Sequence, residues 1–289
     1  LTAFLNGRAL YRRESYADAG VECERALELD STFALAALRL ALAADRLNTA
    51  EQHDGALGLA WSHKDALSPI DRAHLVAFAG PRYPDPSNEA EQLRAWNEAA
   101  MLAPDRSEVW EELGERFFYS GAVLGAVDAR ARAQGAFERA LALDPSSDGA
   151  RIHLLMLAAR SADTATLRRY ASEEALRELG ERSDFVRWRV SVALGHRTQA
   201  ERARERFPAM GRENLRLVAQ STLYDGIEAE DGERALRLLR ARSRRTVEVV
   251  DAILAQHALA LNEGRATYAL DLTEQLEQLS PASEAHLRL

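Results

Sequence analysis

The stretch 110–145 most constrains what this chain can fold into. Trp110, Leu113 and Phe117 recur at intervals of three and four residues, which places them on one face of a helix. Gly114 shares that helix, and because glycine has no Cβ, a partner helix can approach it closely. A second helical run follows, and a proline closes it. The stretch therefore predicts two antiparallel helices, and such a hairpin can bury its apolar face only by stacking on neighbours.

The second helical run carries Ala133, Phe137 and Ala140 before it ends at Pro145. Together with the Trp-x-x-Leu-Gly pattern of the first helix, these residues resemble the tetratricopeptide repeat (TPR), a helix hairpin of roughly 34 residues. The resemblance implies an all-α fold: a right-handed superhelical solenoid of about seven TPR-like hairpins, several of them degenerate or carrying insertions. It also implies a single array over residues 1–289.

The repeat pattern is clearest in the segments 1–31, 71–104, 105–145 and 250–283, and a less regular middle covers 146–249. Two departures stand out within the clear segments: a proline-rich stretch at 80–87, which predicts an ordered loop, and an apolar insertion at 120–126 in the turn of the best hairpin. The residues that we expect to pack the hairpins together are Gly7, Ala19, Ala26, Trp96, Ala99, Trp110, Leu113, Gly114, Phe117, Ala133, Phe137, Ala140, Pro145, Ala269 and Pro281.

No spacing of residues predicts a chemical site. The seven histidines are scattered with no two within one helical turn, and Cys23 is the only cysteine, so neither a metal site nor a disulfide is expected. The net charge of −8 disfavours nucleic acid or an anionic membrane as a general partner. No apolar run approaches about 18 residues, so no membrane span is expected. We therefore expect a protein without enzymatic activity and without a cofactor.

Charged residues recur on two of the predicted first helices. They are Arg8, Arg12, Glu108, Glu111, Glu112 and Glu115. In the TPR family the first helices line the concave groove where peptides bind, so the resemblance implies a polar groove suited to an extended segment of mixed charge. The alternative is an ordinary solvated helix face, because Glu108 and Glu112, like Glu111 and Glu115, have the spacing of neighbours on any helix.

The irregular middle is rich in arginine. Residues 181–245 hold fifteen arginines against ten acidic residues. A solvated arginine face explains this excess better than a nucleic-acid groove, because the aromatic residues that stack on bases are missing. A pocket lined by Arg168, Arg169, Tyr170 and Trp188 would instead make this region a sensor for a small molecule.

The function that the sequence favours is a non-catalytic protein–protein interaction scaffold, a monomer that binds a partner segment in its concave groove. The order of 30–36, 67–72 and the enlarged hairpin also resembles the TPR regions attached to bacterial serine/threonine kinases and large transcriptional regulators. Because the chain opens on Leu1 inside a helical pattern, we expect an excised module of a larger bacterial signalling protein. The alternative is a domain that senses a small ligand in the middle and is coupled to a kinase or transcription factor elsewhere. The compartment stays open between cytoplasm and periplasm.

Overall fold

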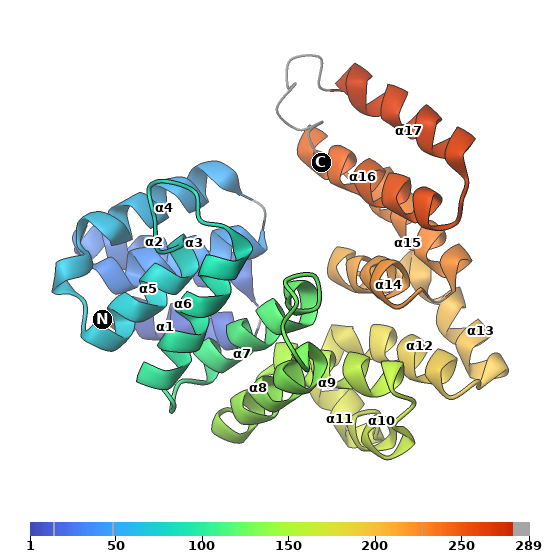
Figure 1. Cartoon of the computed structure of the whole chain (residues 1–289), viewed down its shortest axis with the longest axis horizontal. Helices are drawn as coiled ribbons and strands as arrows, with labels where there is room; N and C mark the ends of the chain where they lie inside the picture. Colours follow the sequence, from blue (N-terminus) through green and yellow to red (C-terminus); the bar gives the residue numbers. More distant parts are fainter. Residues whose placement is uncertain (14, 48, 227, 280–289) are drawn as a thin grey trace. The chain divides into compact units, whose positions relative to one another are not determined.

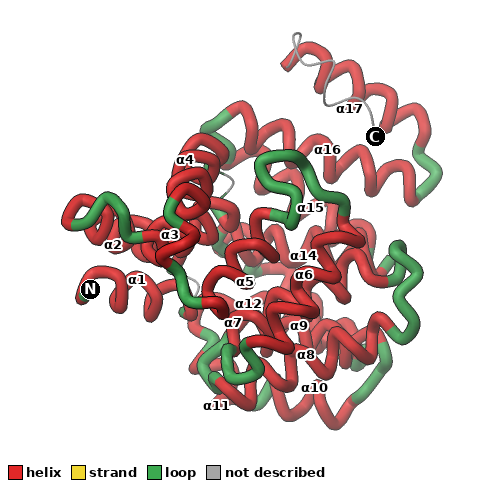
Figure 2. The backbone as a smooth tube through the Cα atoms, turned by 60° about the vertical axis from the view of Figure 1, so that its left-hand side comes forward, coloured by secondary structure: helices red, strands yellow, loops and turns green. Residues whose placement is uncertain are grey.

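The structure, a computed structural model, describes residues 1–13, 15–47, 49–226 and 228–279, with the backbone only at 170, 178 and 181. Within these residues every regular element is a helix and there is no β-strand (Figure 1, Figure 2). The chain divides into two compact units, unit 1 (Leu1–Leu154) and unit 2 (Leu155–Leu289). The prediction of an all-α fold made of helix hairpins is confirmed, whereas a single array over residues 1–289 stays a prediction.

Unit 1 consists of successive helix hairpins, in which α1 packs on α2, α3 on α4, α5 on α6 and α7 on α8. Between hairpins α2 also packs on α3, and α6 on α7, so that each hairpin rests on the next. The helices are α1 (Thr2–Arg12), α2 (Tyr16–Leu29), α3 (Ala34–Arg46), α4 (Ala50–Ser62), α5 (Pro69–Ala79), α6 (Glu89–Leu102), α7 (Ser107–Arg116) and α8 (Ala129–Leu143), with a 3-10 turn η1 (Lys64–Ala66) and a π-helical turn η2 (Phe117–Gly121). The next helix, α9 (Asp148–Arg160), begins in unit 1 and ends in unit 2.

Side-chain caps and glycines decide where the helices of the third hairpin begin and end. Ser68 caps α5 by accepting a hydrogen bond from the Asp71 amide, and Pro69 occupies the first turn, where its missing N–H costs nothing. Gly80 ends α5 with φ of +90°, a conformation that a side chain would disfavour. The proline-rich stretch that follows is a loop, and α6 then begins at a reciprocal capping box formed by Asn88 and Glu91.

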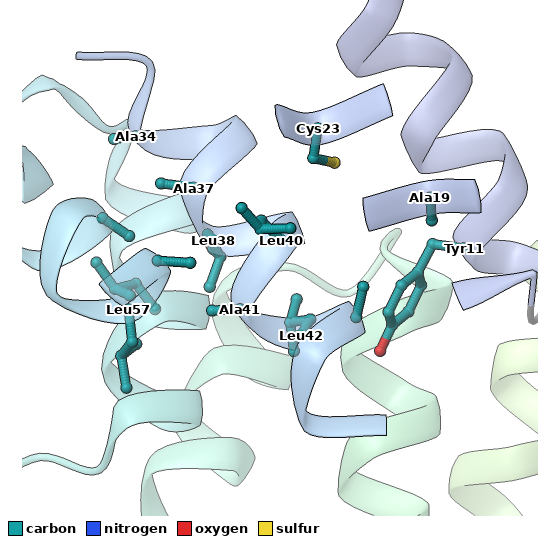
Figure 3. Packing of buried hydrophobic residues seen from close by; sticks show 14 of the residues in the cluster. Tyr11, Ala19, Cys23, Ala34, Ala37, Leu38, Leu40, Ala41, Leu42 and Leu57 are labelled. Atoms are coloured by element: carbon teal, nitrogen blue, oxygen red, sulfur yellow. The ribbon is translucent and has the colours of Figure 1, made fainter. Parts of the chain in front are cut away.

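The core of unit 1 is built largely from small residues. Figure 3 shows Ala19 and Cys23 of α2 in the same buried cluster as Leu38, Ala41 and Leu42 of α3. A Cβ built on Gly7 would lie 2.9 Å from the Cys23 sulfur. The helices of the first hairpin are therefore close enough that only glycine fits there.

The same close approach recurs in the fourth hairpin. A Cβ on Gly114 would lie 2.7 Å from the Phe137 ring, which is fully buried between α7 and α8. Leu113, Phe117, Trp96 and the expected alanines of α6 and α8 (Ala99, Ala133 and Ala140) are buried, as are Ala19 and Ala26 of α2. Pro145 is exposed just beyond the end of α8.

Trp110 does not belong to that buried set. Its ring is only half-buried, and its indole N–H donates to the Pro104 carbonyl across 3.2 Å. The expectation that it fills the interior of the hairpin beside Leu113 is therefore wrong. The indole instead covers the turn between α6 and α7, where its N–H keeps a polar partner.

Unit 2 continues with shorter helices and then returns to long hairpins. The helices are α10 (Thr164–Tyr170), α11 (Glu173–Glu178), α12 (Ser183–Ala193), α13 (Arg197–Glu205), α14 (Arg212–Asp225), α15 (Ala229–Arg242), α16 (Thr246–Asn262) and α17 (Ala266–Leu279), with 3-10 turns η3 (Gly180–Arg182) and η4 (Phe207–Ala209). Residues 164–179 form two short helices, because Ser172 starts a new helix by accepting a hydrogen bond from the Ala175 amide.

The hairpins of unit 2 pair α12 with α13, α14 with α15, and α16 with α17. Gly232 of α15 lies so close to α14 that a Cβ there would be 2.6 Å from Thr222. Ala269 is buried in the last hairpin, in one cluster with Ile253 and Leu272. Pro281, which the sequence places at the end of that hairpin, lies outside the described residues.

Candidate functional site

A polar hollow, which we call the charged pocket, lies among the first helices of the hairpins of unit 1. Its walls come from α1, α2, α3, α5 and α7 and from the turn between α8 and α9. It holds about 20 Å³ of space open to the centre of a water molecule, enough for roughly one water or one polar head group, and is partly open to solvent. The charged side chains that line it are Arg12, Arg39, Glu108, Glu111, Glu112 and Asp144.

Arg46 at the end of α3 clamps two of the predicted glutamates. Its Nη1 donates to both carboxylate oxygens of Glu115, at 3.0 and 2.9 Å, and its Nη2 donates to Glu112 at 2.6 Å. Glu112 is only 7% exposed. Charge-assisted pairs of this geometry, shielded from water, tie α7 to α3 and hold both carboxylates in place.

Arg39 lies two helical turns before Arg46 on α3, and its guanidinium group has fewer hydrogen-bond acceptors. Its guanidinium is buried at 7% exposure and stacks on the Tyr11 ring, 4.7 Å from the centroid. Its Nη2 lies 3.5 Å from Glu108, yet its Nε and Nη1 are buried without any hydrogen-bond acceptor among the described residues. Each such orphaned donor is costly, because it has lost water and gained no partner.

Among the carboxylates that line the charged pocket, Glu111 has the weakest stabilising contacts. Its partner is the Ser147 hydroxyl, which donates to it at 2.7 Å, and no basic group of the described residues forms an ion pair with it. Burial, as the largest cause, and the neighbouring charge of Glu115 raise the pKa of Glu111 from its ordinary value of 4.5 to about 7, although the Ser147 hydrogen bond and the charge of Arg46 lower it. Near neutral pH this side chain is therefore close to half protonated.

The rim toward α1 carries the predicted arginines. Arg12 lies 3.4 Å from Asp144, whose Oδ2 is buried without a hydrogen-bond donor. Arg8 is half-buried near Glu108. Burial opposes ionisation of Glu108, but the charge of Arg39, a backbone hydrogen bond and the charge of Arg8 hold the pKa of Glu108 below its ordinary value.

His74 of α5 closes the floor of the charged pocket. It is 4% exposed, its ring packs edge-on against Trp96, and its Nε2 has no partner among the described residues. Burial lowers the pKa of His74 from 6.5 to about 4, and the charge of Arg39 adds to the effect. The imidazole is therefore neutral at physiological pH and offers either a donor or an acceptor, depending on its tautomer.

The structure thus brings the predicted charged residues together on one side of unit 1. Arg12, Glu108, Glu111 and Glu112 line the charged pocket, Glu115 is tied to Arg46 beside it, and Arg8 lies near Glu108. The alternative of an ordinary solvated helix face is wrong, because these glutamates are largely buried and three of them pair with arginines of α3.

The residues that lie against the glutamates of α7 were not predicted from the sequence. Arg39, Arg46 and His74 stand in apolar stretches of α3 and α5, which read as core helices. The signal that could have found them is a charged or titratable residue inside an apolar run, because such a residue is buried only with a partner. Ser147 and Asp144 belong to the turn after α8 and carry no such signal.

The side chains that were predicted to line a pocket in unit 2 differ in burial, and that of Tyr170 lies outside the described part of the structure. Trp188 is fully buried in the core, between Phe185 and Phe207, and its indole N–H donates to Asp231 at 2.8 Å. Arg168 and Arg169 are exposed. The prediction of a pocket lined by Trp188 is therefore wrong, because the indole packs inside the core and its N–H donates an internal hydrogen bond.

A broader hollow of about 430 Å³ lies elsewhere in unit 2, beside α15. Its charged groups satisfy one another: Arg204 binds Asp231 at 2.7 Å and Glu228 at 2.7 Å, and Arg237 pairs with Glu233 at 3.0 Å. Several arginines of 181–245 make such internal contacts; Arg206 pairs with Asp184 in the same way.

No cluster of three His, Cys, Asp or Glu side chains within the described ranges could hold a metal ion. In the same part of the chain, none of the helices combines the length and the apolar character needed to cross a bilayer.

The fold is that of an all-α protein built from successive helix hairpins. No family model and no curated protein matches the sequence. Similar solved structures include PilW, a widely conserved type IV pilus biogenesis factor, at 17% identity over 98% of this chain and 94% of that chain, with a TM-score of 0.34. PilF of Pseudomonas aeruginosa is similar at 19% identity over 72% of this chain and 90% of that chain, with a TM-score of 0.41. Yeast Tom70 is similar at 18% identity over 96% of this chain and 60% of that chain, with a TM-score of 0.46. At these identities and TM-scores the likeness bears on neither partner nor activity.

Proposed function

We propose that this protein is a non-catalytic interaction scaffold that holds a segment of a partner protein along the charged pocket of unit 1. One observation carries the proposal. Polar and charged side chains from α1, α3, α5 and α7, each the first helix of its hairpin, converge on a partly open hollow instead of facing solvent separately. Stacked hairpins create an extended binding surface in this way, because equivalent positions of successive repeats line up.

The charge pattern supports a polar or mixed-charge segment as the ligand. The surface offers carboxylates, guanidinium groups and a neutral imidazole within one hollow, and complementary charges steer encounter and fix the register of a bound chain. Buried donors without acceptors, such as those of Arg39, would gain their partners from the main-chain carbonyls of that segment.

Site-specific photo-crosslinking tests the proposal. A photoreactive amino acid at Arg12, on the rim of the charged pocket, should capture a defined segment from lysate of the organism that makes the protein. The same group at Arg130, which is exposed on α8 outside the pocket, is the matched control. A synthetic copy of the captured segment should then bind the wild type and bind the charge reversal Arg12→Glu less tightly than Arg130→Glu. Capture from both positions alike, or equal binding to both variants, would place the binding surface elsewhere.

A further inference from the structure

The charges around the charged pocket do not balance. Four carboxylates line it, those of Glu108, Glu111, Glu112 and Asp144, against two guanidinium groups. Beyond the lining, Arg46 pairs with Glu112 and Glu115, the charge of Arg116 also acts on these two carboxylates, and the charge of Arg8 acts on Glu108. A largely buried carboxylate without a basic partner is unfavourable, so the pocket has room for one more positive charge beside any carboxylate that lacks one.

The missing positive charge is located at one side chain. Glu112 and Glu115 share Arg46, Glu108 lies beside Arg39, and Asp144 lies 3.4 Å from Arg12. Glu111 has only a serine hydroxyl as its partner among the described residues. Ser147 links Glu111 to Asp144, because its hydroxyl donates to Glu111 and its amide donates to the Asp144 carbonyl at 3.1 Å.

A second, independent observation concerns donors and not acceptors. Arg39 is more than nine-tenths buried, lines the pocket, and keeps two N–H groups without acceptors. A ligand that matches the pocket must therefore bring a hydrogen-bond acceptor as well as a positive charge. A basic residue within a peptide has both, since its main-chain carbonyl lies a few bonds from its side-chain cation.

We infer that the charged pocket receives one basic side chain of the bound segment. Glu111 holds its cation, the carboxylate of Asp144 adds to the negative field of the same pocket, and Arg39 donates to a main-chain carbonyl next to it. The inference rests on the proposed function for the presence of a segment, and it adds the chemistry by which that segment is recognised. A free anion does not fit, because the carboxylates would repel it.

The site carries a proton of its own, which makes binding depend on pH. Glu111 faces Glu112 and Glu115 on its own helix, Arg46 of α3, Tyr16 of α2, and Asp144 and Ser147 of the following turn. A bound cation favours the ionised carboxylate, so binding releases a proton at low pH. Because the pKa of Glu111 is about 7, the affinity for a cation should rise about tenfold between pH 6 and pH 8.

The test uses small probes with the full chain. Nα-acetyl-lysine-N-methylamide supplies the ammonium and the carbonyls, its norleucine analogue lacks only the charge, and the arginine analogue separates the two basic residues. Titrations followed by NMR at pH 6 and pH 8 should show saturable binding of the lysine or the arginine probe, about tenfold tighter at pH 8, and at least tenfold weaker binding of the norleucine probe.

Two variants locate the cation. Glu111→Gln should abolish the pH dependence and weaken binding of the basic probe at pH 8 about tenfold, and Asp144→Asn supplies a second reading if the first variant does not fold. The control Glu98→Gln removes an exposed carboxylate of α6 and should bind as the wild type does. Binding that is equal for the basic and norleucine probes, or equal in Glu111→Gln and Glu98→Gln, overturns the inference. So does the absence of saturable binding of any probe, which is the result for a pocket that holds only ordered water.

The outcome separates this inference from the proposed function. If crosslinking captures a segment whose basic residues can be replaced by norleucine without loss of affinity, the scaffold role stands and the cation subsite falls. If the lysine probe binds through Glu111 while no segment is captured, the subsite stands and the proposed function falls.

Discussion

Both units bury charged side chains, but they do so in opposite ways. In unit 2 the Asp225 carboxylate is enclosed by two arginines: Arg189 donates to it at 2.7 Å and Arg160 forms a second ion pair with it. Arg189 is 2% exposed. In the charged pocket of unit 1 the lining carboxylates outnumber the lining guanidinium groups, and Glu111 has no basic partner among the described residues. Buried arginine donors without an acceptor occur in both units, at Arg39 and at the Nε of Arg189.

The difference separates a structural charge from a charge available to a ligand. A buried ion pair whose two charges satisfy each other adds little net stability. Removing one partner is nevertheless strongly destabilising, because it leaves the other charge unpaired in a medium of low polarity. A cluster with one unpaired carboxylate beside a hollow is the arrangement that we propose binds a ligand. The following predictions test this contrast, from the largest expected effect to the smallest.

Asp225→Ala should be the most damaging change. It leaves the guanidinium groups of Arg160 and Arg189 buried without their carboxylate, which typically costs about 3–5 kcal/mol of unfolding free energy. Chemical denaturation read out by hydrogen exchange in α12 and α14 measures the effect within unit 2. The control Asp184→Ala breaks an ion pair with Arg206, which is 60% exposed, and should cost no more than about 1 kcal/mol. Equal losses in the two variants would mean that the enclosed pair is not special.

His74 should make unit 1 sensitive to acid. Its pKa is lowered to about 4 in the folded chain from 6.5, so the unfolded chain takes up the proton first. The stabilising effect of keeping this imidazole neutral is complete above pH 6.5 and declines as the pH falls toward 4, by up to about 3 kcal/mol. Unfolding free energies measured from pH 7 to pH 4 should fall less steeply in His74→Leu. His53→Leu leaves the buried histidine in place and should keep the steep profile.

Gly114→Leu tests whether the framework beneath the charged pocket is rigid. The new side chain would meet the Phe137 ring and push α7, with its four glutamates, away from α8, costing about 1–3 kcal/mol. The melting temperature should fall, and the captured segment should bind less tightly. Gly135→Leu is the matched control, because a Cβ at Gly135 meets nothing within 4 Å. An unchanged melting temperature in Gly114→Leu would contradict the close contact between α7 and α8.

Glu111→Gln should stabilise the unbound chain, in contrast to every other change at a buried charge. The pKa of Glu111 is raised in the folded chain, so the carboxylate destabilises the fold increasingly as the pH rises from about 4.5 through 7. The side chain is partly exposed, which reduces the expected gain at pH 8 to about 1 kcal/mol, with none at pH 4. Differential scanning at the two pH values measures it. A loss of stability at pH 8 would show that Glu111 is already paired, and the contrast between the units would disappear.

Much of the fold could be predicted from helical periodicity, because the spacing of Leu113 and Phe117 and the close-packing glycines carry that information locally. The prediction failed where a local signal has two readings. Trp110 fits the apolar spacing, yet its indole covers a turn and donates to a carbonyl. The run 164–179 reads as one helix, yet Ser172 interrupts it with a cap of its own.

For the site, spacing along α7 could show that the four glutamates share a helix, but not what they face. Their partners, Arg39 and Arg46 on α3, lie more than sixty residues earlier in the chain. The same spacing on an isolated helix would describe a solvated face. Only the position of α3 against α7 distinguishes the two.

The sequence by itself determined that this chain is helical, where the hairpins turn, and which residues are small enough for helices to touch, because backbone propensity, capping and side-chain volume act over a few residues. The tertiary structure decided which charges find partners. It enclosed Asp225 between two arginines in unit 2 and left Glu111 with a serine in unit 1. The free energy of a charged group depends on its burial and on its distance from charges on other segments of the chain. Neither quantity can be derived from the residues that are its neighbours in the sequence.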